Sequence, residues 1–119
     1  MNQQKLTKVG RSLANNKLIV IENLAATIDM IREGGGLVDA EEFRELFCAS
    51  IDHLDLKVAD LAEELVVSEG TISRWRNGKA MPTHWARSAI LGKIREFAQR
   101  EIEIVSLQVS DNGQSAAQA

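Results

Sequence analysis

Residues 56–82 of the 119-residue chain contain two short stretches with helical apolar spacing, separated by only a few residues. The first runs from about Lys57 to Leu65. The second follows Ser68, a residue type that commonly caps the start of a helix. Gly78 then offers the left-handed conformation in which many helices stop. The segment therefore predicts two short helices that cross at a tight turn.

Each side of this unit has an expected role. Ala62 must be small so that the second helix can cross the first closely. Positions 69, 70, 71 and 74 then lie together on the outer, N-terminal side of the second helix, where a helix can reach the base edges of DNA. The wedge between the two helices is expected to contain Leu61, Leu65, Val67, Ile72 and Trp75.

Residues 56–82 resemble the helix-turn-helix of the phage repressor and Cro class, also called the XRE class. The resemblance rests on the wedge residues, on Ala62 and Ser68, and on the Asn-Gly-Lys exit at 77–79. It implies that residues 69–77 form the recognition helix of a bacterial or phage transcription regulator, such as a repressor. Such a regulator binds double-stranded DNA and generally does so as a homodimer on two half-sites.

The same resemblance assigns individual positions to the DNA. The base-reading positions are Glu69, Gly70, Thr71 and Arg74. The phosphate-binding positions are Lys57, Ser68, Arg76, Asn77 and Lys79.

The chain departs from the family pattern at several of these places. Val66 occupies a turn position where relatives usually have glycine, although a β-branched residue is costly at positive φ. Gly70 leaves one base-reading position without a side chain. Glu69 repels phosphate but can accept a hydrogen bond from a cytosine amino group. Arg76 replaces a common acid and makes the end of the recognition helix more basic.

The flanking sequence predicts an all-α, five-helix-type domain over residues 37–100. Asp39 and Glu42 resemble a capping box that opens a helix over 39–53, and Pro82 precedes a longer helix over 83–98. The inward side chains are expected to be Phe43, Leu46, Phe47 and Ile51 in the first of these helices and Trp85, Ala89, Ile90, Ile94, Phe97 and Ala98 in the second.

Outside this domain the sequence predicts four further segments. Residues 1–17 form a basic, flexible arm, and residues 18–36 form an N-terminal helical extension that ends in a glycine connector. Residues 101–109 either continue the preceding helix or make a short strand, and they are the favoured dimerisation segment over the apolar face of residues 18–32. Residues 110–119 have little to bury and are expected to be a disordered tail.

The net charge of −3 argues against a nucleic-acid partner, but the charge is unevenly distributed along the chain. One segment, which we call the basic window, is strongly basic. Between Gly70 and Arg95 there is no acid, whereas the bases are Arg74, Arg76, Lys79, Arg87, Lys93 and Arg95. No apolar run is long enough for a membrane span. The single cysteine, Cys48, is expected to be a small core residue in a cytoplasmic protein.

The sequence contains little that supports a catalytic function. His53 and His84 lie far apart in the sequence, and the glycines at 34–36 lack the Lys-Ser/Thr of a phosphate-binding loop. The sequence therefore predicts no catalytic residue, metal, cofactor or small-molecule ligand. The alternative to a DNA-binding regulator is a protein-interaction module, such as an antitoxin-like subunit, that keeps the fold with weak or no DNA binding.

Overall fold

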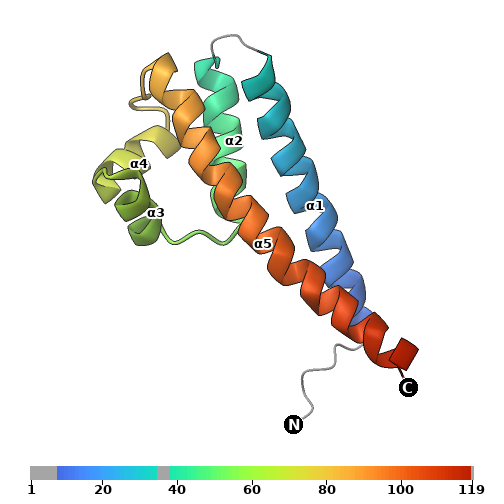
Figure 1. Ribbon diagram of the computed structural model, residues 1–119. Coiled ribbons are helices and arrows are strands. Elements are labelled where there is room, and N and C mark those ends of the chain that lie inside the picture. The colour runs from blue at the N-terminus through green and yellow to red at the C-terminus, as the bar shows by residue number, and fades with distance from the viewer. Residues whose placement is uncertain (1–7, 35–37, 119) are drawn as a thin grey trace.

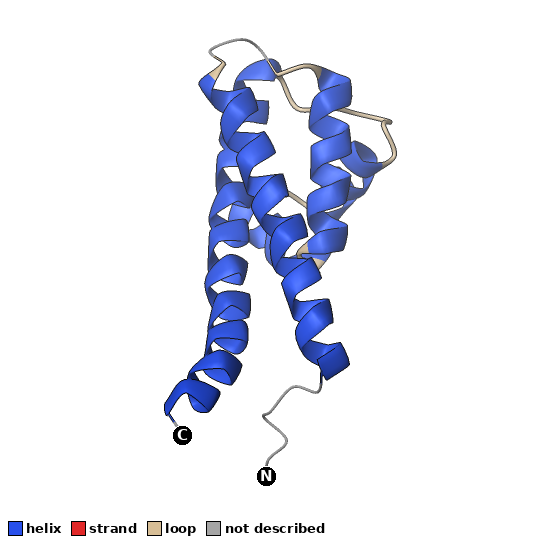
Figure 2. Ribbon diagram, turned by 90° about the vertical axis from the view of Figure 1, so that its right-hand side faces the viewer, coloured by secondary structure: helices blue, strands red, loops and turns tan. Residues whose placement is uncertain are grey.

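The computed structural model describes residues 8–34 and 38–118. This part of the chain contains helices and no strand (Figure 2), which confirms the predicted all-α class. No helix in the described residues has the length and hydropathy needed to cross a membrane. The helices are α1 (Lys8–Glu33), α2 (Ala40–His53), α3 (Val58–Leu65), α4 (Glu69–Arg76) and α5 (His84–Gln118).

Side chains cap the helix starts that the sequence predicts. The Asp39 carboxylate accepts hydrogen bonds from the backbone N–H groups of Glu41 and Glu42, at 2.9 and 3.2 Å. The Ser68 hydroxyl accepts one from the N–H of Thr71 at 3.1 Å. These oxygens satisfy donors that have no partner within the helix, so they fix where α2 and α4 begin.

A single core joins α1 to the other helices. The rings of Phe43 and Phe47 stack 5.2 Å apart, and the indole of Trp75 meets both edge-on at 6.2 and 5.7 Å. Ile21 and Ile28 of α1 are fully buried in the same cluster. The helix predicted as an N-terminal extension therefore belongs to the domain itself, because its apolar face completes the core.

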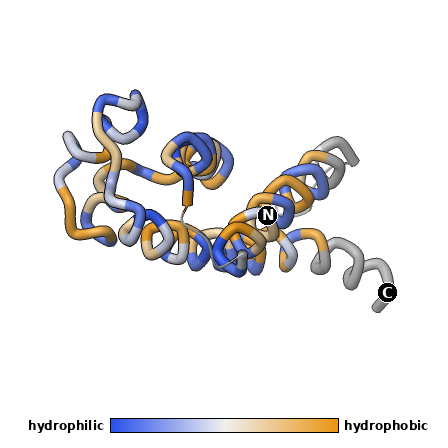
Figure 3. Tube along the Cα trace, turned by 90° about the horizontal axis from the view of Figure 1, so that it is seen from above, coloured by the Kyte–Doolittle hydropathy of each residue, from blue (hydrophilic) through white to orange (hydrophobic). Residues whose placement is uncertain are grey.

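Helices α1 and α5 lie side by side and extend beyond the other three (Figure 1). Hydrophobic and hydrophilic residues alternate along both (Figure 3). Lys17 of α1 forms an ion pair with Glu101 of α5 at 3.3 Å, and Val105 is buried nearby in α5. Residues 8–17, which were predicted to belong to a flexible arm, are helical, and Lys17 ties the end of this stretch to α5. Residues 1–7 of that arm lie outside the described residues.

Helix α5 also resolves the ambiguous C-terminal segment. Residues 101–109 are helical and not a strand, and the helix continues to Gln118 where a disordered tail was expected. The only proline is Pro82, so no later residue lacks a backbone donor, and a formed helix extends more readily than a new one begins. Most of the predicted glycine connector, residues 35 and 36, lies outside the described residues, as does residue 119.

The two tryptophans differ in their surroundings. Trp75 is buried as predicted, but the prediction that Trp85 is a core residue is wrong, since 77% of it is exposed. Trp85 precedes the fully buried Ile94 by nine positions, which is two and a half helical turns. The two side chains therefore lie on opposite faces of α5, and only one of those faces meets the core.

Candidate nucleic-acid interface

The turn between α3 and α4 takes a left-handed conformation of the kind that favours glycine, despite its valine. Val66 has φ 58° and ψ 49°, in the left-handed region. Its N–H donates to the carbonyl of Glu63 at 3.2 Å, and the N–H of Val67 donates to that of Ala62 at 2.9 Å. This pair of bonds is the Schellman arrangement that ends many helices. The backbone hydrogen bonds therefore hold the turn even though a β-branched residue is strained there.

The end of α4 is closed in the same way. Gly78 has φ 75°, its N–H donates to the carbonyl of Trp75 at 3.4 Å, and the N–H of Lys79 donates to that of Arg74 at 2.9 Å. Here the residue in the left-handed conformation is the predicted glycine. The C-terminal ends of α3 and α4 are thus fixed by main-chain bonds, and the buried Trp75 anchors α4 to α2.

A chain of polar contacts runs along the outer side of α4. The hydroxyls of Ser68 and Thr71 lie 2.9 Å apart, and Arg74 Nη2 donates to Thr71 Oγ1 at 3.2 Å. A Cβ added to Gly70 would lie 3.4 Å from Arg74 Nη1. The guanidinium therefore lies back along the first turn of the helix, in van der Waals reach of position 70.

The predicted base-reading positions gather on one surface. Glu69, Gly70 and Arg74 are exposed, and Thr71 is half-buried under the Arg74 side chain. This surface offers a guanidinium that a side-chain hydroxyl holds in place. A guanidinium of this kind can donate two parallel hydrogen bonds to a guanine edge or to a phosphate.

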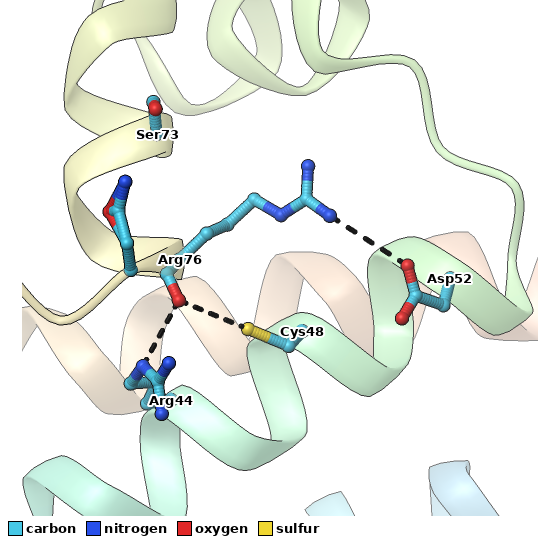
Figure 4. Close-up of a pocket in the computed structure, with 6 residues that line it drawn as sticks. Arg44, Cys48, Asp52, Ser73 and Arg76 are labelled. Carbon is cyan, nitrogen blue, oxygen red and sulfur yellow. Dashed lines mark hydrogen bonds and ion pairs between the residues drawn. The ribbon is translucent and has the colours of Figure 1, made fainter.

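Arg76 lies apart from this surface. It lines a shallow pocket of about 440 Å³ between α2 and the end of α4 (Figure 4), and its Nη2 is 3.8 Å from Asp52 Oδ1. Its carbonyl accepts hydrogen bonds from Arg44 Nε at 3.0 Å and from the Cys48 thiol at 3.5 Å. Cys48 is consequently half-buried at the pocket wall, which corrects the expectation of a core residue.

The remaining predicted phosphate-binding residues lie at the start of α3 and after the end of α4. Lys57 precedes α3, and Asn77 and Lys79 follow α4, all three with exposed side chains. Among the described residues, neither Lys57 nor Lys79 has an ion pair with a carboxylate, whereas Arg76 has one. The Ser68 hydroxyl is occupied in the cap and in the contact with Thr71.

Folding neutralises much of the basic window. Arg95 Nε donates to both oxygens of Asp29 at 3.0 and 3.1 Å, and Lys93 lies 3.4 Å from Glu64 Oε2. Arg87 donates to the carbonyls of Pro82 and Val38, at 2.9 and 2.8 Å. Among the described residues, the exposed cations without a carboxylate partner are Lys57, Arg74 and Lys79 in and beside α3 and α4, together with Arg32 in α1 and Arg100 in α5.

The sequence analysis missed two residues of this region, Arg44 and Ser73, which line the pocket with Arg76. Arg44, Cys48 and Asp52 are spaced four residues apart, so they share one face of α2. That spacing was enough to predict that the three side chains lie together on α2. It could not show that the end of α4 would pack against this face.

Comparisons of the chain with models of known protein families, with curated proteins and with solved structures give no match. The assignment of this surface therefore rests on its residues and on their geometry.

Proposed function

We propose that the chain binds double-stranded DNA sequence-specifically in the cytoplasm and regulates transcription, with α4 entering the major groove. The observation that carries the proposal is the contact between Arg74 and Thr71 on the exposed side of a short helix fixed at both ends. An arginine held in this way loses less side-chain freedom when it pairs with a base. Gly70 next to it allows the helix backbone to approach the groove closely.

The charges around α4 support the same proposal. Lys57 before α3 and Lys79 after α4 are exposed and can each neutralise a phosphate, and the exposed Arg74 lies between them in the sequence. Phosphate contacts set the position of a protein on DNA, and contacts with base edges supply specificity. The residues near α4 provide both kinds of contact.

One observation favours the alternative of a protein-interaction module. Arg76, Arg87, Lys93 and Arg95 of the basic window already bind acceptors within the protein. A surface with so few free cations has weak general affinity for DNA. The alternative therefore predicts that no duplex is preferred over any other.

Selection of bound duplexes from a random pool separates the two functions. We expect an enriched sequence, and Arg74→Ala should weaken its binding by about 1–3 kcal/mol and relax the preference at one base pair. Arg100→Ala is the matched control, because it removes the same charge from an exposed site where the guanidinium lies over the Phe97 ring. A pool without enrichment, or equal effects of the two substitutions, contradicts the proposal.

A further inference from the structure

The pocket between α2 and the end of α4 joins two elements that are distant in the sequence. Its lining comes from both sides: Arg44, Cys48 and Asp52 on α2, and Ser73, Arg76 and Asn77 at the end of α4. Its volume of about 440 Å³ is that of a small-molecule site, for which the usual range is roughly 300–1,000 Å³. The Arg76 side chain stretches from α4 past Cys48 toward Asp52 (Figure 4).

The carbonyl groups at this end of α4 already have donors. The last four carbonyls of an α-helix lack partners within the helix. Those of residues 73–75 accept from the backbone N–H groups of residues 77–80, at 2.9–3.4 Å. The carbonyl of Arg76 accepts from Arg44 Nε and from the Cys48 thiol. The end of the helix therefore presents few free acceptors to the pocket.

The two arginines, in contrast, keep unused donors. A guanidinium has five N–H groups. Arg44 uses Nε for the Arg76 carbonyl and places Nη1 3.7 Å from Glu41, whereas Arg76 places Nη2 3.8 Å from Asp52. Both carboxylates are exposed, and ion pairs at such positions contribute little to stability. A ligand can therefore take over a guanidinium at small cost.

Ser73 and Asn77 add neutral donors to the same wall. Both side chains are exposed, and neither forms a hydrogen bond within the described part of the chain. Two guanidiniums and the single carboxylate of Asp52 give the lining a net positive charge. The free groups of the pocket thus suit a ligand that is negatively charged and rich in acceptor atoms.

We propose that this pocket binds the phosphate group of a small phosphate ester, with Arg76 as the main ligand. Guanidinium groups form strong charge-assisted hydrogen bonds with phosphate oxygens. A phosphate group has more acceptor oxygens than a carboxylate, so it can accept from α2 and from α4 at once. The volume exceeds that of a phosphate group alone and leaves room for the organic part of the ester.

Binding replaces the Asp52 carboxylate by the phosphate as the partner of Arg76. This exchange has a regulatory consequence, which rests on the proposed function. Because Arg76 is one of the expected phosphate-binding residues for DNA, a bound ester withdraws it from the duplex. The ester should then weaken DNA binding.

Titration of the full chain with inorganic phosphate, at constant ionic strength, tests the site. In ¹H–¹⁵N spectra we expect saturable shifts of the Arg44 Nε–H, which reports on the pocket through its bond to the Arg76 carbonyl. Arg76→Gln should raise the dissociation constant by about tenfold or more, since it removes a charged donor. Asp52→Asn should lower the dissociation constant, because the competing carboxylate is gone.

Arg100→Gln is the matched control. It removes the same charge from an exposed site of α5, where the guanidinium lies over the Phe97 ring, and should leave phosphate binding unchanged. Ser73→Ala provides a second variant in case Arg76→Gln does not fold. It removes an exposed hydroxyl that makes no bond in the described structure, so it should weaken phosphate binding and leave folding intact.

The absence of saturable shifts overturns the inference, and so do equal effects of Arg76→Gln and Arg100→Gln. A backbone phosphate of DNA has the same chemistry as the ester, so a titration with the selected duplex separates the two sources. Shifts of the Arg44 signal with the duplex but not with free phosphate would assign the pocket to DNA and reject the inference. Phosphate binding by a protein that selects no duplex would instead reject the proposed function and leave the inference standing.

Discussion

Arg74 and Thr71 are joined by a hydrogen bond of 3.2 Å that turns the guanidinium back along the first turn of α4. A Cβ at Gly70 would lie 3.4 Å from Arg74 Nη1, an ordinary van der Waals distance to the end of a flexible side chain. The helix thus contains a glycine near its start, where most residues would stabilise it more.

Gly70→Ala is therefore expected to separate stability from binding. The free energy of unfolding should rise by about 0.5–1 kcal/mol, because alanine restricts the unfolded chain and the end of a flexible arginine can move aside. Binding to a selected duplex should weaken at the same time, because the added methyl group keeps the helix backbone farther from the groove. Urea denaturation and a binding titration measure the two effects.

Gly92→Ala is the control for this prediction. A Cβ at Gly92 would lie 3.0 Å from both Cζ and Nη2 of Arg32, whose Nε is bonded to the Ser88 carbonyl. The gain in stability should therefore be smaller than for Gly70→Ala, or reversed. A larger gain from Gly92→Ala would contradict our account of the Arg74 position.

Val66→Gly should stabilise the protein by about 0.5–1 kcal/mol. The left-handed conformation costs an ordinary residue about 1–2 kcal/mol, and the greater freedom of glycine in the unfolded chain offsets part of this gain. Little packing is lost because the Val66 side chain is 88% exposed. Asp55→Gly, at φ 52°, should gain less, since aspartate tolerates this conformation better. A lower denaturation midpoint for Val66→Gly would show that the valine contributes packing.

Asp52→Asn should strengthen DNA binding under the proposed function. The substitution removes the carboxylate 3.8 Å from Arg76 Nη2, so the guanidinium becomes available to phosphate. The plot of log K against log salt should steepen by up to about one unit. Glu33→Gln makes the same change in net charge at the exposed end of α1. Equal salt dependence of the two variants would mean that Arg76 does not reach the DNA.

Ile28→Ala tests whether α1 is part of the domain. Ile28 is fully buried, so the truncation should lower the free energy of unfolding by about 2–5 kcal/mol. Leu107→Ala, at an exposed position of α5, should change it by less than about 0.5 kcal/mol. Similar small effects at both positions would restore the interpretation of α1 as a separate extension.

Local signals in the sequence predicted most of the fold around α3 and α4. Ser68 and Gly78 fix the ends of α4 through hydrogen bonds to nearby backbone groups, so their roles can be inferred from a few neighbouring residues. The burial of Trp75 followed in the same way from helical spacing. The resemblance to known helix-turn-helix units added the assignment of outer positions, which stays a prediction.

Features that depend on distant parts of the chain were not predictable. Arg95 is 66 positions from Asp29, and Arg76 is separated from Asp52 by more than one helix. The basic window therefore contains no acid in the sequence, but folding brings acidic residues from other parts of the chain next to it. The prediction for Trp85 was wrong for a related reason. The apolar residues of α5 lie on two faces of the helix, and only packing decides which of those faces is buried.

The neutralisation of the basic window has a consequence for the way in which the proposed regulator finds its site. Few counterions are released when a surface with so few free cations meets DNA of arbitrary sequence, so such encounters are brief. A protein of this kind spends little time sliding along the duplex. Under the proposed function, such a protein would reach its operator mainly by direct collision from solution, at a rate that changes little with the ionic strength of the cell.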